Sequence, residues 1–389
     1  MQKKEIAILD FGSEKLTVVV GSKDVNNTFV IRGKGESDYA GFLDGEFLEP
    51  EKLKIAMGVA ISNAEEDANT EIHKLYIGVP AEFCYCVCKN VSQTYDKSKV
   101  ISAKDVDELF AQGNNFGDIQ SHIVINKSPI YYNIDGDTQV LSPIGKFAQK
   151  LSASISFVMA ENNFIQLING FLYDLDITSC EYLSSTLAQS LFLLDEETRD
   201  GYAILVDCGY ITTSACLVKG EGMLTLSSFS QGGGHITGDL STCLKIPFSD
   251  AETLKRKIVL NIDPKENDSY EMVINSQPVP ISSKIANAIV ESRVEVIAKG
   301  VIKCMSIWQY EYPDYIPIYL TGGGLSYLKG AKDLIAKMTG RNVEILSSPT
   351  TQYNKPHLTS AISLLNLAIV QEEIKQPKGF WNKIKKIFS

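Results

Sequence analysis

Three short segments pair glycine with acidic or hydroxyl residues, a combination suited to phosphate chemistry. Asp10-Phe-Gly12-Ser13, Asp207-Cys-Gly209 and Thr321-Gly-Gly-Gly324 each end an apolar run. A glycine turn exposes backbone N–H groups that a phosphate can approach, and nearby hydroxyls add donors. The aspartates would repel a phosphate, so we expect them to orient water around Mg²⁺. Each segment alone is also consistent with an ordinary hairpin turn, and only their order and spacing favour a common site.

The elements that must position these residues follow a repeated plan. Residues 5–9 and 202–206 are apolar, and after its turn each is followed by a second apolar strand, at 16–20 and 213–218. Two such hairpins, about 200 positions apart, predict two similar α/β lobes.

The rest of the chain alternates helical and strand-like patterns, as a layered α/β protein does. Residues 92–156 differ, because a helix start signal at Ser102 stands among short strand-like pieces and predicts an inserted subdomain. Helical periodicity is expected at 51–69, 163–175, 239–262, 282–310 and 358–370, and strands at 74–79, 123–125, 131–134 and 315–321.

Composition excludes several classes. The 389 residues are 44% hydrophobic and 22% charged, which is ordinary globular usage, and the net charge is −10. An acidic body argues against nucleic acid as a partner. No apolar run approaches the roughly 20 residues that cross a bilayer, and no signal peptide is evident, so we expect a cytoplasmic protein. Cys84, Cys86 and Cys88 alternate as on one strand face, with no second ligand pair nearby, so we expect no metal there.

The last twelve residues form an amphipathic pattern. Wound into a helix, they place aromatic and isoleucine side chains on one face and lysines, with no acidic residue, on the flanks. This pattern is typical of a helix that lies on an anionic membrane surface, whereas the alternative is a terminal helix docked on its own protein. The residues predicted to bind membrane are Phe380, Trp381, Lys383, Ile384, Lys385, Lys386, Ile387 and Phe388.

The three glycine segments together resemble the phosphate-one, phosphate-two and adenosine motifs of the actin-like ATPase superfamily. Within it, Gly232-Gly-Gly-His-Ile-Thr-Gly-Asp239 and Ala251-Glu252-Thr-Leu-Lys255 are similar to motifs of the bacterial FtsA cell-division family. The resemblance spans nearly the whole chain. It implies an α/β, actin-like (ribonuclease H-like) two-lobed fold with a small α+β subdomain inserted in the first lobe.

The resemblance also implies domain limits and site residues. The limits are 1–90 and 159–238 for the lobe cores, 91–158 for the insertion, 239–314 for an outer subdomain, 315–370 for the returning core, 371–377 for a tether and 378–389 for the membrane helix. ATP and Mg²⁺ are the implied cofactors, with Mg²⁺ held through water by Asp10 and Asp207. The implied cofactor-binding residues are Asp10, Gly12, Ser13, Lys15, Asp207, Gly209, Thr212, Thr213, Gly233, Gly234, Glu252, Lys255, Gly322, Gly323 and Gly324.

The second turn departs from the family pattern. Tyr210 and Ile211 stand where relatives usually have glycines, and an isoleucine resists φ > 0 while a tyrosine ring adds bulk beside the phosphates. We therefore expect weakened or altered nucleotide binding and at most slow ATP hydrolysis. No catalytic residue is assigned, and Glu161 is only a minor candidate for positioning the attacking water.

Three functions remain open at this point. The first is an FtsA-like protein on the cytoplasmic face of the membrane at the division septum, which binds the C-terminal tail of FtsZ and polymerises with itself. The second is a PilM-like pilus-assembly adaptor, although that family is not known for such a terminal helix. The third is a small-molecule kinase, for which the sequence offers neither a catalytic aspartate motif nor a substrate pocket.

Overall fold

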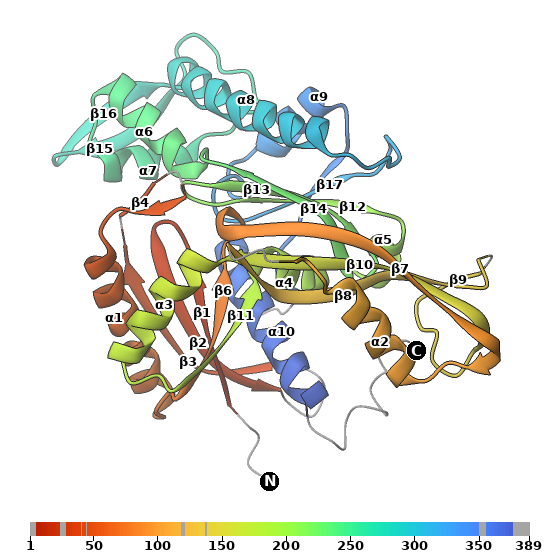
Figure 1. Ribbon diagram of the computed structural model, residues 1–389. Helices are drawn as coiled ribbons and strands as arrows, with labels where there is room; N and C mark the ends of the chain where they lie inside the picture. Colours follow the sequence, from red (N-terminus) through yellow and green to blue (C-terminus); the bar gives the residue numbers. More distant parts are fainter. Residues whose placement is uncertain are drawn as a thin grey trace.

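The protein consists of two lobes, stacked one above the other in Figure 1, and a long sheet that projects from the first lobe. The structure is a computed structural model and describes residues 5–23, 29–39, 41–43, 45–117, 121–136, 138–349 and 355–375. The predicted membrane helix (378–389) lies outside the described residues. Within the described part, no helix combines the length and apolar character needed to cross a membrane.

The first lobe is built on a five-stranded sheet of order β11-β6-β1-β2-β3. Strands β1, β6 and β11 are parallel, and β2 and β3 are antiparallel to their neighbours. The strands are β1 (Ile6–Phe11), β2 (Lys15–Lys23), β3 (Phe29–Asp38), β6 (Lys74–Val79) and β11 (Ser179–Ser184), and a two-residue pair is formed by β4 (Phe42–Leu43) and β5 (Glu46–Phe47).

Alternating apolar residues let this sheet bury both faces. Ala7 and Leu9 of β1 pack with α1 (Pro50–Ala68) and α3 (Asn162–Asp174), whereas Ile6 and Ile8 pack with α10 (Thr359–Lys375). Helix α4 (Ser185–Leu193) contributes to that second face and also packs against the second lobe's sheet. It therefore joins the two lobes.

The second lobe repeats the topology of the first. Its sheet has the order β14-β13-β12-β17-β18, so strand for strand it matches the first lobe in chain order and direction. The strands are β12 (Ala203–Cys208), β13 (Thr213–Lys219), β14 (Gly222–Phe229), β17 (Ile318–Thr321) and β18 (Val343–Ile345). The two similar α/β lobes expected from the sequence are thus confirmed.

Helices cover the outer face of the second sheet and carry a small hairpin, seen at the top of Figure 1. The region predicted as one helical stretch, 239–262, contains a break at Lys245, which adopts φ 55°, before Pro247. The elements of this layer are α6 (Gly233–Leu244), α7 (Phe248–Lys257), β15 (Ser269–Ile274), β16 (Gln277–Ser282), α8 (Ser283–Ile307) and α9 (Ala331–Thr339). The short helix α5 (Glu196–Asp200) lies outside this layer and precedes β12.

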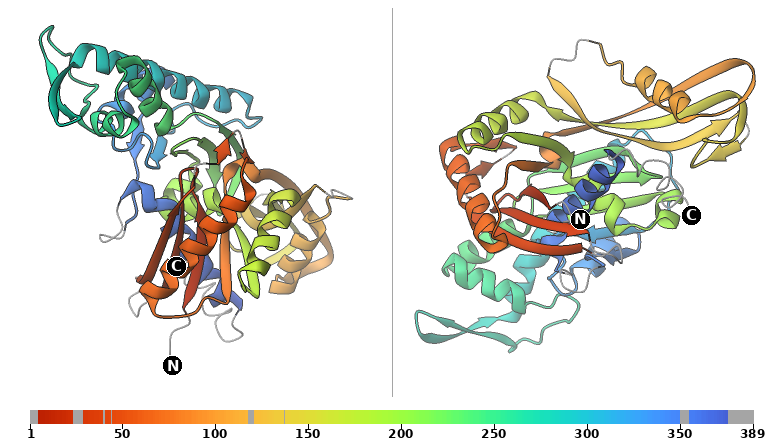
Figure 2. Two further views of the ribbon diagram at one scale, coloured as in Figure 1. Left: turned by 90° about the vertical axis from the view of Figure 1, so that its left-hand side faces the viewer. Right: turned by 90° about the horizontal axis from the view of Figure 1, so that it is seen from below.

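The inserted subdomain is a four-stranded antiparallel sheet that extends away from the first lobe, as Figure 2 shows from below. The two short strands expected at 123–125 and 131–134 form one long strand. The first and last strands of the insertion in chain order, β7 and β10, reach beyond the expected limits of 91 and 158. Helix α2 (Ala103–Gly113) packs on one face. The strands are β7 (Cys84–Val100), β8 (His122–Ile134), β9 (Thr138–Val140) and β10 (Phe147–Glu161).

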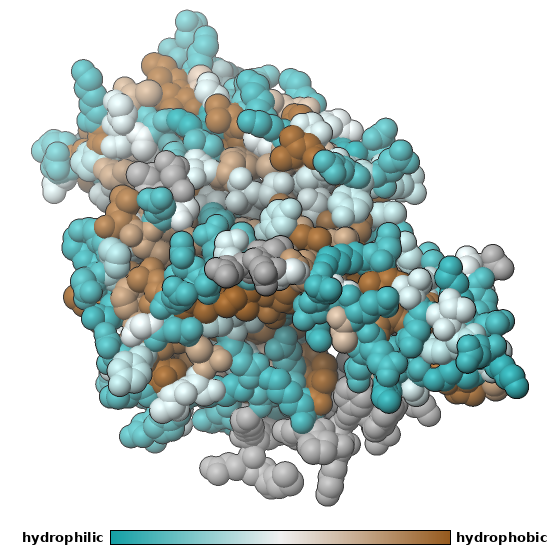
Figure 3. Space-filling view, viewed as in Figure 1, coloured by the Kyte–Doolittle hydropathy of each residue, from teal (hydrophilic) through white to brown (hydrophobic). Residues whose placement is uncertain are grey.

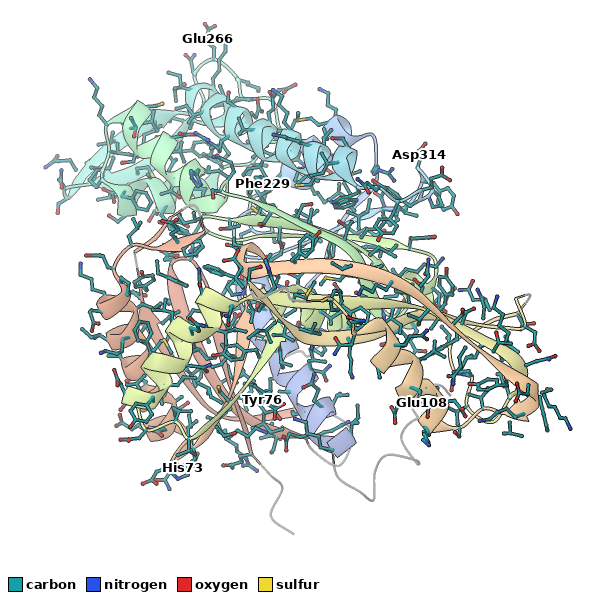
Figure 4. The ribbon with its side chains drawn as sticks, viewed as in Figure 1. His73, Tyr76, Glu108, Phe229, Glu266 and Asp314 are labelled. Atoms are coloured by element: carbon teal, nitrogen blue, oxygen red, sulfur yellow. The ribbon has the colours of Figure 1, made fainter. Side chains whose placement is uncertain are left out.

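The last described helix is longer than expected. Helix α10 runs to Lys375 and so includes most of the predicted tether, 371–377. Its end is fixed because the buried Glu372 carboxylate accepts hydrogen bonds from Lys74 Nζ (2.7 Å) and from the Tyr76 hydroxyl, which Figure 4 labels beside this helix. The chain therefore stays attached to the first lobe up to the end of α10 at Lys375.

Candidate nucleotide-binding cleft

The two Asp-x-Gly turns have the same local structure. Gly12 N–H donates to the Lys15 carbonyl (3.0 Å), and Gly209 N–H donates to the Thr212 carbonyl (2.8 Å). A Cβ on Gly12 would lie 2.6 Å from the Lys15 oxygen, so only glycine fits there. The equivalent strand pairs, Asp10 with Thr17 and Asp207 with Ser214, have the same register relative to the turns. Each lobe thus presents one acidic strand end and one tight turn.

These turns meet in a cavity of about 820 Å³ between the lobes. This volume falls within the range of small-molecule sites. The third glycine segment joins them closely, because a Cβ on Gly324 would lie 2.3 Å from the Gly209 oxygen. The predicted cofactor-binding residues that line the cavity are Asp10, Gly12, Ser13, Lys15, Asp207, Gly209, Thr212, Gly233, Glu252, Lys255, Gly322, Gly323 and Gly324.

Two predicted residues, Thr213 and Gly234, do not line the cavity but support it. The Thr213 hydroxyl is buried and donates to the Gln231 carbonyl (2.6 Å). Gly234 N–H donates to the Tyr210 carbonyl (2.7 Å), and the Tyr210 ring lies against this glycine. The prediction that these two contact a cofactor directly therefore has no support in this geometry, because their polar groups are used within the second lobe.

Asp10 and Asp207 face the cleft from opposite lobes. Burial raises the pKa of Asp10 to about 7, a hydrogen bond from Ser360 opposes this, and Asp207 raises it further. Burial likewise raises the pKa of Asp207, against a hydrogen bond from Gln189. Hydrogen bonds of 2.7 Å from Ser360 Oγ and 2.8 Å from Gln189 Nε2 hold the two carboxylates.

This carboxylate pair has the oxygen chemistry that Mg²⁺ prefers. In the described part of the chain, no cluster of three or more histidine, cysteine or acidic side chains could hold a metal by itself. A magnesium ion would therefore be held by Asp10 and Asp207 together with water and ligand oxygens, where it would supply positive charge beside a phosphate.

Glu252 and Lys255 form an ion pair inside the second lobe, on the cleft-facing side of α7. Their charged groups are 2.6 Å apart, and Lys255 also donates to the Gly233 carbonyl (3.0 Å) and to Thr237 Oγ1 (2.8 Å). Burial alone would raise the pKa of Glu252, but hydrogen bonds from Lys255 and Thr237 hold it below its ordinary value. The pair is therefore more than an exposed surface contact.

The altered second turn is accommodated without backbone strain. Neither Tyr210 nor Ile211 has a positive φ. Ile211 N–H donates across the cleft to Ser13 Oγ (3.0 Å), and this hydrogen bond joins the two phosphate turns directly. The conflict between isoleucine and a positive φ, expected from the sequence, therefore does not arise, because neither residue adopts the left-handed backbone conformation.

The cleft is also lined by residues that the motifs did not indicate, and three of them are polar side chains at its centre or rim. Glu82, Gln189 and Ser360 all face it, whereas Glu161, the minor catalytic candidate, does not. Burial raises the pKa of Glu82 above its ordinary value. Glu82 follows β6 and Gln189 follows β11, and these parallel strands end at the same edge as β1. Ligand sites in α/β proteins form at the carboxyl ends of the parallel strands. The positions of Glu82 and Gln189 just after such strand ends could therefore have identified them from the sequence.

The repeated sheets and the cleft between them define an actin-like fold. Solved structures support this class: the PilM-PilN type IV pilus biogenesis complex has a TM-score of 0.62 at 14% identity, covering 94% of this chain and 99% of that one. MreB5 of Spiroplasma citri bound to ADP has a TM-score of 0.55 at 11% identity, covering 96% and 97%. A MamK double helical filament has a TM-score of 0.52 at 14% identity, covering 96% and 99%. At these identities the likeness concerns the fold alone.

Within this class, the sequence is similar to FtsA. Residues 204–363 match the family model described as cell division protein FtsA. FtsA of Enterococcus hirae is 23% identical over 374 residues, covering 95% of this chain and 84% of the relative. FtsA of Neisseria meningitidis serogroup B is 22% identical over 394 residues, covering 97% and 94%. The resemblance to the FtsA family stated from the motifs is therefore confirmed.

Proposed function

We propose that this protein is an FtsA-like adaptor that attaches FtsZ filaments to the cytoplasmic face of the membrane at the division septum. The similarity to FtsA proteins along 95% of the chain carries the proposal. In this role the protein binds the C-terminal tail of FtsZ, and its own amphipathic terminus, 378–389, contacts anionic lipid.

The cleft supports the nucleotide part of this function. Its size, its two glycine turns and its oxygen-rich floor at Asp10 and Asp207 suit an adenine nucleotide with Mg²⁺. By the resemblance this nucleotide is ATP. It acts as a conformational and assembly cofactor, with at most slow hydrolysis.

Self-assembly supports the membrane part. One short amphipathic helix gives only modest membrane affinity, and several helices on one filament bind together far more strongly. The actin-like MamK forms a double helical filament, so the fold is compatible with such assembly. The end of α10, tied to the first lobe through Glu372, would fix the point from which each helix departs.

Co-sedimentation with anionic liposomes tests the anchor. Replacing Trp381 and Ile384 with glutamate puts charges on the apolar face, so we expect the variant and any bound FtsZ to stay in the supernatant. Replacing Asn382 and Ser389 with glutamate adds the same charge away from the core of that face and should preserve most pelleting. Equal pelleting of the first variant and the unchanged protein would reject the anchor.

A PilM-like adaptor is the second candidate, favoured by the likeness to the PilM-PilN structure. A pull-down with immobilised FtsZ C-terminal peptide and with a peptide from a pilus membrane protein distinguishes the two functions. We expect capture by the FtsZ peptide only. Capture by the pilus peptide alone would replace our proposal with the second candidate.

A further inference from the structure

The second phosphate turn has few backbone N–H groups left for a ligand. Gly233 N–H donates to the Gly209 carbonyl (2.9 Å), and Gly234 N–H donates to that of Tyr210 (2.7 Å). Ile211 N–H is bonded to Ser13 Oγ across the cleft. A phosphate is held by N–H groups that point into its site, so the start of α6 and this turn are engaged with each other instead.

The Tyr210 side chain fills space at the same end of the cleft. A Cβ on Gly234 would meet three carbons of the ring at 2.8–3.0 Å, so the ring covers the start of α6. Burial, with Glu14 and Glu252 nearby, raises the pKa of Tyr210 to about 12. The phenol is therefore neutral and bulky, and a phosphate entering here would have to displace it.

The first turn differs from the second. Ser13, Glu14 and Lys15 all line the cavity. Gly12 N–H is bonded within its own turn, as Gly209 N–H is in the second turn, and Ser13 Oγ accepts the Ile211 N–H. Lys15 Nζ is partly exposed and lies 3.5 Å from Glu36, a distance at which the pairing is loose. The first lobe therefore presents a turn and the Lys15 ammonium group to a phosphate. In the second turn, hydrogen bonds and the Tyr210 ring occupy the groups and the space that a phosphate would need.

We propose that the cleft retains a nucleoside diphosphate in preference to a triphosphate, and that Tyr210 and Ile211 set this preference. The inference rests on the nucleotide binding proposed above, but it makes ADP, and not the ATP implied by the resemblance, the form that is held more tightly. A triphosphate must break the Ser13–Ile211 hydrogen bond and move the Tyr210 ring, whereas a diphosphate served by the first turn need not.

Calorimetric titration of the full chain, with Mg²⁺ and either ADP or the non-hydrolysable analogue AMPPNP, tests this preference. We expect ADP to bind at least about tenfold more tightly. In the double variant Tyr210→Gly/Ile211→Gly, AMPPNP affinity should rise until the two affinities agree within about threefold. Tyr315→Gly, which changes a tyrosine that is 84% exposed outside the cleft, should keep the original ratio.

The outcomes separate this inference from the function on which it rests. Equal affinities in the unchanged protein, or an unchanged ratio in the double variant, overturn the preference but leave nucleotide binding intact. If neither nucleotide binds the unchanged protein, nucleotide binding itself is refuted together with the preference.

Hydrogen exchange of the unchanged protein keeps the test open if the double variant does not fold. We expect the Ile211 amide to be protected both without nucleotide and with ADP, and to exchange at least about tenfold faster with AMPPNP, because the triphosphate must break its bond to Ser13. Equal protection with both nucleotides would contradict the proposal.

Discussion

Lys255 is a buried cation whose neighbours in the cleft wall are oxygen atoms. It is 8% exposed and contacts Glu252, Thr237 and the Gly233 carbonyl. Replacing Lys255 with methionine leaves the Glu252 carboxylate half-buried without its nearest cation. We therefore expect the free energy of unfolding, measured in urea, to fall by about 2–4 kcal/mol.

Arg256 provides a matched control for that substitution. It pairs with the same Glu252 at 3.3 Å, but its side chain is 72% exposed, so Arg256→Met should cost under about 0.5 kcal/mol. If both variants lose the same stability, the Lys255 interactions are no stronger than a surface ion pair, and our description of this network is wrong.

At the scale of elements, the start of α2 depends on one carboxylate. Ser102 and Asp105 form a reciprocal cap, and Lys99 Nζ lies 2.7 Å from Asp105. Burial would raise the pKa of Asp105, but the hydrogen bonds from Lys99 and Ser102 lower it to about 2.

This lowered pKa predicts a pH dependence. A carboxyl group whose pKa is lower in the folded than in the unfolded state stabilises the fold above its unfolded pKa, near 4, and loses that effect as pH falls toward 2. At pH 7 we expect Asp105→Asn to reduce the protection of α2 amides in hydrogen exchange by about 1–2 kcal/mol. The difference from the unchanged protein should shrink below pH 4, and a difference independent of pH would refute the assignment.

The contact between β3 and α1 depends on glycine facing alanine. A Cβ on Gly35 would lie 1.9 Å from the Ala60 carbonyl oxygen, within the helix backbone. We expect Gly35→Ala to destabilise the protein by about 2–3 kcal/mol in chemical unfolding, because the helix must move outward. Gly170→Ala, in an exposed turn of α3 with nothing within 4 Å, should instead stabilise by about 0.5–1 kcal/mol. If both substitutions changed the free energy of unfolding in the same direction, the close packing of β3 on α1 would be contradicted.

The sequence predicted those elements whose signals are local. The hairpins at Asp10 and Asp207 were predicted because alternating apolar residues and a glycine turn mark them, and Ser102 marked α2. The first turn of α6 was not predicted, since Gly233 and Gly234 are poor helix formers. Their N–H groups are satisfied by carbonyls of the second turn, a contact between distant segments that no local pattern records.

At the scale of the whole molecule, the same limit applies to the cleft. Glycine motifs predicted the residues that meet there, because close backbone approach demands glycine at Gly12 and Gly324. Glu82 and Ser360 belong to no recognisable motif. They reach the cavity because Glu82 follows the end of β6 and Ser360 lies at the start of α10. Hydrophobic side chains also reach the surface in scattered groups among hydrophilic ones, as Figure 3 shows, so surface pattern alone does not locate the site.

Because residues of both lobes line the cleft, a ligand bound there should stabilise them together. A ligand at 100 times its Kd stabilises the folded state by about 2.7 kcal/mol. With Mg²⁺ and ADP at that concentration, we expect the calorimetric Tm to rise by roughly 3–6 °C, since larger chains shift by fewer degrees per kcal/mol. Inorganic phosphate at the same concentration should leave Tm within about 1 °C. Helix α4 packs on both sheets, so we expect the two lobes to unfold together. Two separate unfolding peaks, only one of which shifts with ADP, would show that the ligand contacts one lobe and not both.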